Sequence, residues 1–420
     1  MQSPNQQGGS NMKTLRAFTG GIIVLMAGLQ AGPSQAKEAA AETSWAPFIE
    51  MDGQLFPSMV VATATVKPDE DEEQDASLIG DPYGQIGAVV ESAPAGAKLR
   101  LVVRETRWFA ASEESATVEE AGDYSIFPKL GWNYDNLLKA RQVEPASVVM
   151  ELFVNGKSLG TRTETVTVRS LNDCPLYRMP TDEDGKPVDS DEGAATEGED
   201  LSFMFAAYVT ENHPWVDQIT KEALESGVVD SFTGYQSGEE DEVYKQVFAI
   251  WNVMQRRGMR YSDITTSSAE SRVVLSQHVR LFDEAVAARQ ANCVDGTVLF
   301  ASILRKINIT PYLVLVPGHM FLAFDLDEEG TSMVALETTM MGNTDLRKFD
   351  ARKIPPEVRE ANKNNASFAA FNAAIETGSE ALSADAEKFE SDDPEAAQYQ
   401  LISVAEARKM GILPLASKKE

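Results

Sequence analysis

A cysteine, a histidine and an acid stand at the edges of three apolar runs in the second half of this chain. Cys293 opens the first run, which continues to Ile307 and is apolar on most sides, as is typical of a buried helix. After a short apolar run at 312–316, His319 begins another run, and Glu337 falls near the end of the run that follows; all three have the length of strands. This order predicts a compact helix followed by a hairpin, with the three polar side chains within reach of one another.

The start of the predicted helix favours a negative charge at Cys293. Asn292 is a good N-cap residue, and Asp295 three positions later resembles a capping box. Cys293 then lies in the first turn, where unpaired backbone N–H groups and the helix dipole stabilise an anion. The thiolate is the nucleophilic form of cysteine, and the backbone N–H of Cys293 could donate to an oxyanion as it forms. We therefore interpret Cys293 as a nucleophile; the competing interpretation is a small apolar core residue.

The register of the hairpin can be predicted from its loop. Two strands, 320–326 and 333–338, are expected around a three-residue loop that ends at Gly330 in the left-handed conformation. This register places His319 and Glu337 diagonally on one face, within hydrogen-bond reach, whereas a slip of one residue would place them on opposite faces. Glu337 would then orient His319, and His319 would accept the thiol proton. The alternative is that Glu337 faces solvent as an ordinary strand residue.

These residues resemble the transglutaminase-like superfamily of papain-type cysteine enzymes over about residues 240–345. The matching segments are Asn292-Cys293-Val294-Asp295 with its continuation Leu299–Arg305, Gly318-His319-Met320-Phe321, and Leu336-Glu337-Thr338-Thr339. The resemblance implies an α+β domain in which the cysteine helix packs on an antiparallel sheet. It also implies Cys293 as the nucleophile, His319 as the base and Glu337 as the third member. Gln277, ahead of the helix, is a candidate oxyanion donor.

Two positions depart from the pattern of that family. The third member is usually Asp, and Glu337 is one methylene longer. The aromatic residue two positions after the histidine is usually Trp, and here it is Phe321. Members of the family include protein cross-linking enzymes, peptidases, amidases and inactive scaffolds, so the resemblance does not fix the reaction.

Residues 1–36 are typical of a secretory signal peptide. Lys13 and Arg16 precede the apolar run Phe18–Leu29, which is followed by small residues up to Ala36. The run is too short for a permanent transmembrane helix, which needs about 20 apolar residues. We expect cleavage after Ala36 and a periplasmic or secreted protein with no membrane span after cleavage.

Composition predicts four parts after the leader. Residues 45–172 contain short alternating runs and turn signals, and predict an all-β sandwich of immunoglobulin type. Residues 173–200 have the acidic, Gly-, Pro- and Ser-rich composition of a linker. Residues 201–349 would form the transglutaminase-like domain, and 350–420 a polar helical extension. The predicted fold class is therefore multi-domain, with an all-β sandwich ahead of an α+β domain.

Four finer expectations concern individual segments. Asn155-Gly156 predicts a tight hairpin turn, because both residues tolerate a positive φ. Ser58–Val66 is expected to be a strand, and Ser271–Arg289 a helical segment. Trp108-Phe109 is interpreted as a core or edge pair rather than a binding patch.

Charge and cysteine content restrict the function. The net charge of −28 opposes binding to nucleic acid and anionic membranes. The acidic runs 69–75 and 181–200 are interpreted as solvated linkers, because neither has the spacing of an EF-hand calcium loop. A Cys174–Cys293 disulfide is an alternative to a free catalytic thiol in an exported protein. A zinc site at Cys293 and His319 is less favoured, because no HExxH or paired CxxC motif is present; no cofactor is expected.

The sequence thus predicts an exported cysteine hydrolase or acyltransferase that acts on amide bonds through a thioester. Peptidase or amidase action is preferred to cross-linking, because water is abundant and no lysine-docking feature is visible. The substrate would be a protein, a peptide or a cell-wall peptide. The alternative is a catalytically inactive transglutaminase-like binding or scaffold protein of the periplasm.

Overall fold

The computed structural model describes residues 42–67, 75–181, 187, 198–263, 271–342, 366–391, 393 and 396–415. The predicted signal peptide lies outside these residues, as do most of the two acidic runs. The described chain divides into two compact units. We call them the N-terminal unit, which ends at Ser202 but also includes residues 271–278, and the C-terminal unit, which contains residues 203–263 and everything described from Val279 onward.

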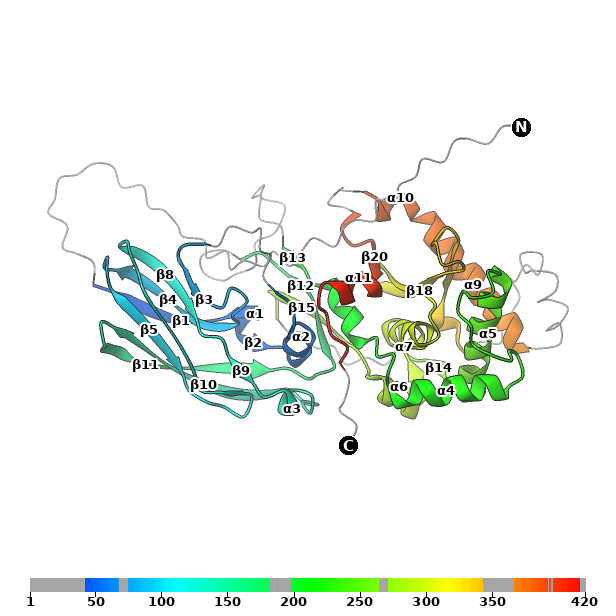
Figure 1. The fold of residues 1–420 in the computed structure, drawn as a ribbon, viewed down its shortest axis with the longest axis horizontal. Helices are drawn as coiled ribbons and strands as arrows, with labels where there is room; N and C mark the ends of the chain where they lie inside the picture. The colour runs from blue at the N-terminus through cyan, green and yellow to red at the C-terminus, as the bar shows by residue number, and fades with distance from the viewer. Residues whose placement is uncertain are drawn as a thin grey trace. The chain divides into compact units, whose positions relative to one another are not determined.

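The N-terminal unit is built mainly from two sheets that contact each other (Figure 1). The first has the order β1 (Ser44–Ile49), β4 (Ile86–Ala93), β8 (Gly122–Phe127), β3 (Leu78–Gly80). The second has the order β2 (Gln54–Leu55), β11 (Lys157–Val168), β10 (Glu144–Val154), β5 (Lys98–Val103), β7 (Ser112–Thr117). Smaller elements are α1 (Glu50–Gly53), α2 (Pro57–Ala62), α3 (Tyr134–Leu137) and the pair β6 (Phe109–Ala110) and β9 (Gly131–Trp132).

Several predictions for this unit can be compared with the structure. The hairpin turn between β10 and β11 is confirmed, with φ of 51° at Asn155 and 79° at Gly156. Trp108 and Phe109 are both buried, as the core interpretation requires. The strand expected at Ser58–Val66 is wrong: this segment forms most of α2, which is buried along its whole length and begins at Pro57. Proline favours the first turn of a helix, and a short apolar run does not by itself distinguish a strand from a buried helix.

A third sheet in the N-terminal unit joins segments that the sequence analysis had separated. Its order is β13 (Glu199–Asp200), β12 (Asp173–Arg178), β15 (Val274–His278). The first residues of the expected linker therefore form a strand. The segment expected to be helical from Ser271 contains β15 and only afterwards a helix, α6 (Phe282–Ala288). The strand β12, which pairs with β15, is distant in the chain, so the residues around β15 did not by themselves indicate a strand.

The C-terminal unit combines helices with a four-stranded antiparallel sheet. Its helical elements are η2 (Ser202–Tyr208, which begins at the boundary), α4 (Pro214–Glu225), α5 (Glu240–Arg256), α6, α7 (Cys293–Lys306), η3 (Thr338–Met340), α9 (Ala366–Ala384), α10 (Ala386–Phe389) and α11 (Val404–Lys409). Its sheet has the order β19 (Met333–Leu336), β18 (His319–Asp325), β17 (Pro311–Val316), β20 (Gln400–Ser403). A short parallel pair, β14 (Arg260–Tyr261) and β16 (Gln290–Ala291), precedes α7.

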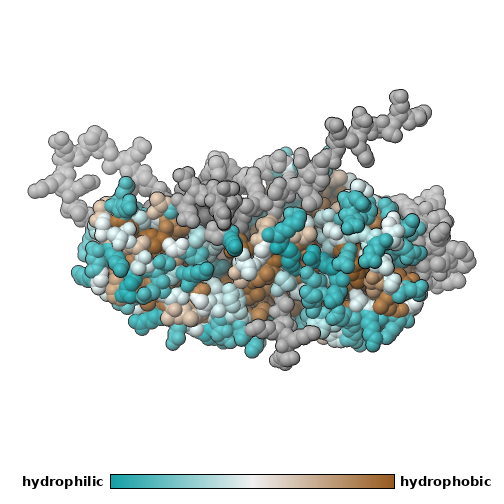
Figure 2. All heavy atoms as spheres, viewed as in Figure 1, coloured by the Kyte–Doolittle hydropathy of each residue, from teal (hydrophilic) through white to brown (hydrophobic). Residues whose placement is uncertain are grey.

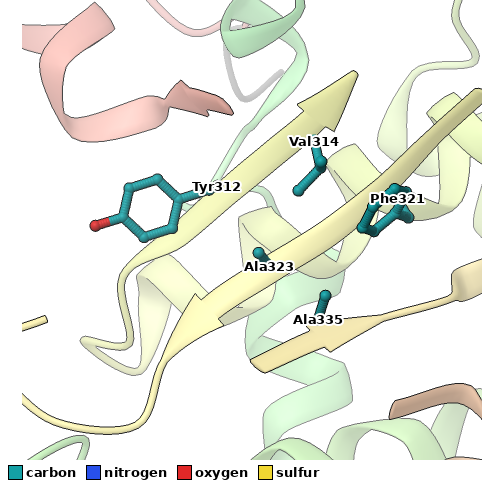
Figure 3. Packing of buried hydrophobic residues seen from close by; sticks show 5 residues of the cluster. All are labelled: Tyr312, Val314, Phe321, Ala323 and Ala335. Carbon is teal, nitrogen blue, oxygen red and sulfur yellow. The ribbon is translucent and has the colours of Figure 1, made fainter. Parts of the chain in front are cut away.

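The two faces of this sheet are buried by different elements. On one face, the side chains of β17, β18 and β19 form a cluster against which residues of α9 and α10 pack (Figure 3). The members are Tyr312, Val314, Phe321, Ala323 and Ala335. The alternate residues of β18, such as Leu322 and Phe324, are fully buried as well, and α7 contacts both β17 and β18. The cysteine-bearing helix is thus packed on an antiparallel sheet.

The last part of the chain contributes more than the predicted helical extension. Within residues 350–420, α9 packs along β19, and β20 adds a strand to the sheet by pairing with β17. The helix α11 follows β20 directly. These elements belong to the core of the C-terminal unit.

The molecule is therefore a mixed α and β protein with several sheets in two compact units. Hydrophilic side chains predominate on the face shown in Figure 2, with smaller hydrophobic areas between them. Among the helices that the structure describes, none has the length and apolar character needed to span a bilayer.

Candidate active site

The first turn of α7 fixes the position of Cys293. The Asn292 side chain accepts a hydrogen bond from the Asp295 N–H at 2.8 Å, and Asp295 accepts one from the Asn292 N–H at 3.1 Å, which completes the predicted capping box. Asp295 is buried and also accepts hydrogen bonds from the backbone and the guanidinium of Arg280, at 2.8 and 2.7 Å. Asp295 is therefore fully used in holding the helix start, and Cys293, the first residue of α7, is partly exposed.

A tight turn sets the position of His319. Val316 and His319 pair across the turn formed by Pro317 and Gly318, and Gly318 has a φ of 72°. Proline followed by a residue with positive φ is the signature of a type II turn, and glycine adopts that second position without strain. His319 is consequently the first residue of β18.

The hairpin of β18 and β19 has the register predicted from its loop. Leu322 pairs with Leu336 and Asp325 with Met333. Gly330 in the loop has a φ of 69°. Glu337 follows the last paired residue of β19 and serves as the N-cap of η3. This register places Glu337 diagonally across from His319.

His319 lies between Glu337 and Cys293. Its Nε2 atom is 2.7 Å from Oε2 of Glu337, and the Cys293 side chain interacts with its ring closely enough to raise the pKa of His319. Since Nε2 faces the carboxylate, Nδ1 is the ring nitrogen left for the thiol. The other carboxylate oxygen of Glu337 accepts hydrogen bonds from the backbone and hydroxyl of Thr339, at 3.0 and 2.6 Å. The acid is therefore held at both oxygens.

The electrostatics of the group favour a charged imidazole. Hydrogen bonds with Cys293 and Glu337, together with the charges of both partners, raise the pKa of His319 to about 10 against the opposing effect of burial. Burial also disfavours ionisation of Glu337, but the hydrogen bonds from His319 and Thr339 outweigh it and lower the pKa of Glu337. Both directions describe an imidazolium stabilised by the Glu337 carboxylate.

Two aromatic residues complete the surroundings. Phe321 stacks on His319, with ring centroids 6.0 Å apart and planes inclined by 28°. Tyr261 pairs with Ala291 across β14 and β16 and is 43% exposed. Its pKa is raised by burial and by the charges of Asp263, Cys293 and Glu337, and its hydroxyl donates a hydrogen bond to Oδ1 of Asp263 at 3.4 Å. The sequence analysis missed Tyr261, because it is distant in sequence and belongs to no recognisable motif.

Gln277 lies on β15. It belongs to the N-terminal unit, where it pairs with Cys174 across β15 and β12. Its side-chain amide donates a hydrogen bond to the His278 carbonyl oxygen at 3.0 Å. The oxyanion role of Gln277 stays a prediction.

Both cysteines are free thiols, so the structure does not contain the alternative disulfide. Cys174 is completely buried, and burial followed by the charge of Asp173 raises its pKa well above the ordinary value. Within the described ranges, no three His, Cys, Asp or Glu side chains converge in a way that could bind a metal ion.

Comparison with known proteins adds no assignment to this geometry. No protein-family model matches the chain, and no curated protein matches it significantly in sequence.

Proposed function

We propose that the C-terminal unit is a transglutaminase-like cysteine hydrolase or acyltransferase acting on amide bonds, and that the mature protein is exported. The observation that carries this proposal is the continuous contact from Cys293 through His319 to Glu337. A nucleophilic triad has three parts: a thiol, here at the start of a helix, an imidazole that can hold its proton, and an acid that orients the imidazole. The short strands and turn signals of residues 45–172 support the further proposal that the β unit is an immunoglobulin-like sandwich.

The chemistry follows from the positions of the three side chains. The thiolate of Cys293 attacks the amide carbonyl carbon, and the carbonyl oxygen takes up the negative charge. His319 gives its proton to the departing amine, the C–N bond breaks, and a thioester forms. Water then attacks the thioester while His319 accepts its proton, and the carboxylic acid leaves as the thiolate is restored. An amine in place of water would give cross-linking by the same steps.

Two departures from the family pattern are accommodated by the observed contacts. The longer side chain of Glu337 reaches Nε2 at hydrogen-bond distance. Phe321 stacks on the imidazole, which is the apolar contact expected of the aromatic residue at that position. Neither substitution removes a group that the proposed reaction uses.

Tyr261 is a second candidate oxyanion donor, in addition to Gln277. Tyr261 pairs with Ala291 in β16, which leads directly into α7, its hydroxyl donates a hydrogen bond to Asp263 at 3.4 Å, and its side chain is exposed enough to meet a substrate. A phenol donor beside the nucleophile, together with the Cys293 backbone N–H, would stabilise negative charge on the carbonyl oxygen.

The test begins with a thiol-directed assay and continues with substrates. Wild-type protein and the Cys293→Ala variant are incubated with a mixed peptide library, with and without a fluorescent primary amine, and the products are identified by mass. New peptide ends that depend on Cys293 support hydrolysis, and amine incorporation supports acyl transfer. If neither product forms, and Cys293 reacts with iodoacetamide no faster than an ordinary thiol, the scaffold alternative replaces the enzyme.

A further inference from the structure

The outer edge of β19 is covered by a helix instead of another strand. The Ala335 N–H donates to the Ser379 hydroxyl oxygen at 3.0 Å, and the same hydroxyl donates to the Ala335 carbonyl oxygen at 3.4 Å. Two residues further on, the Glu337 N–H donates to the Ala374 carbonyl oxygen at 3.0 Å. Backbone groups at a sheet edge need partners, and here α9 supplies them at the strand that leads into Glu337. Figure 3 shows Ala335 on this strand beside Ala323 of β18.

The close approach of α9 depends on Gly378. A Cβ atom at this position would lie 2.8 Å from the Ala335 carbonyl carbon and 2.9 Å from the Ala335 oxygen and the Leu336 nitrogen. These contacts are with backbone, which cannot rotate away as a side chain can. Any other residue at 378 would therefore move α9 away from β19.

The first half of α9 is anchored to α5. The Tyr244 hydroxyl donates a hydrogen bond to the Asn372 side chain. Phe368 and Phe371 of α9 make aromatic contacts with Phe248 and Tyr244 of α5, each with ring centroids 5.0 Å apart. The helix is thus a fixed support, and β19 is held against it.

This support matters because Glu337 lies beyond the last pair of the hairpin. The β18–β19 pairing ends at Leu336, so the neighbouring strand does not hold the Glu337 backbone. Its carboxylate must nevertheless stay 2.7 Å from His319. Contacts with α9 fix the position of the Glu337 backbone instead. They are the hydrogen bond from the Glu337 N–H to Ala374 and the two hydrogen bonds between Ala335 and Ser379.

We propose that α9 is a positioning element of the candidate active site, with Gly378 and Ser379 as positioning residues that set Glu337 against His319. This inference rests on the proposed function only for its catalytic consequence. Its structural claim is that the contacts of α9 control the Glu337–His319 interaction.

The experiment compares Ser379→Ala and Gly378→Ala with Ser383→Ala in the full-length chain. Ser383 is a matched control, because it is one turn further along α9, is exposed, and bonds only within its own helix. Three quantities are measured: amide hydrogen exchange at Ala335 and Glu337, the imidazole titration of His319 by NMR, and the pH dependence of Cys293 alkylation by iodoacetamide.

We expect Ser379→Ala and Gly378→Ala to speed amide exchange at both positions and to lower the His319 titration midpoint by about one unit, a roughly tenfold change in the imidazolium equilibrium. The alkylation profile should shift with it, and Ser383→Ala should change none of the three. A purely structural helix would lower the melting temperature and leave the titration and the alkylation profile unchanged; that result overturns the proposal.

The design separates this inference from the proposed function. If no amide is hydrolysed by the wild type but exchange and titration respond to Ser379→Ala, the positioning claim holds and the enzyme claim fails. If amides are hydrolysed but amide exchange and the His319 titration are unchanged by both substitutions, the enzyme claim holds and the positioning claim fails. If Gly378→Ala does not fold, the milder Ser379→Ala decides the question alone.

Discussion

Gly296 and Thr338 meet where α7 passes η3. An ideal Cβ on Gly296 would lie 2.8 Å from Oγ1 and 3.0 Å from Cβ of Thr338, so only glycine permits this approach. Cys293 lies one helical turn before Gly296, and Glu337 directly precedes Thr338. The contact therefore sets the separation between the helix that carries the thiol and the segment that carries the acid.

Replacing Gly296 with valine should disturb both stability and the site. The added side chain must displace Thr338, which is buried, and overpacking of this kind costs about 1–3 kcal/mol. We expect a lower free energy of unfolding in urea and slower alkylation of Cys293. Gly122→Val is the control, because no atom lies within 4 Å of a Cβ at Gly122. Unchanged stability and alkylation in Gly296→Val would show that the two segments are not held by this contact.

Local signals in the sequence were sufficient for the helix start and the hairpin. The capping box at Asn292 and Asp295 and the left-handed Gly330 are each specified by a few adjacent residues, so the helix boundary and the strand register could be inferred. That register in turn predicted the His319–Glu337 contact, which is present at 2.7 Å.

Contacts between distant segments could not be predicted in the same way. The partner of β12 is β15, about a hundred residues later in the chain, and Tyr261 is placed beside the strand that leads into α7 only because β14 pairs with β16. The support that α9 gives to β19 depends on Gly378, and the need for glycine there is clear only once the backbone of Ala335 is known to lie against it. A single sequence carries periodicity and turn chemistry, but not the identity of a partner across the fold.

The charge on His319 should make stability depend on pH between neutral and alkaline conditions. Its pKa is raised from 6.5 to about 10 in the folded protein, so its contribution is fully present below pH 6.5 and is lost as the pH rises through 10. We expect the stability difference between wild type and His319→Asn to shrink from pH 6 to pH 10 in urea unfolding experiments. A difference that stays constant over this range would contradict the charged form of His319.

Removing the charge of Glu337 should weaken the imidazolium without removing the side chain. Glu337→Gln keeps the length and volume of the residue but loses the anion, so the His319 titration midpoint should fall by about one unit or more, at least a tenfold change. Cys293 alkylation at neutral pH should slow accordingly. Because the pKa of Glu337 is lowered in the folded protein, the contribution of its charge is present above pH 4.5 and lost as the pH falls below it.

Glu337→Asp provides the matched control for geometry. It keeps the charge but shortens the side chain by one methylene, so the 2.7 Å contact with His319 cannot form without movement of the backbone. We expect the His319 titration midpoint in this variant to lie between those of the wild type and Glu337→Gln. An aspartate variant identical to wild type would mean that the charge acts at a distance and that the hydrogen bond is unimportant.

Tyr261→Phe should separate nucleophile activation from transition-state stabilisation. Iodoacetamide reacts at a saturated carbon and develops no oxyanion, so its rate with Cys293 should not depend on the Tyr261 hydroxyl. Attack on an amide or activated ester does develop an oxyanion, and loss of one donor typically slows that step about 10²–10³-fold. Single-turnover thioester formation with an activated ester, measured beside alkylation, checks both rates in one preparation. Equal slowing of the two reactions would instead mean that Tyr261 supports the thiolate itself, and an unchanged ester rate would leave the Cys293 backbone N–H as the donor at the site.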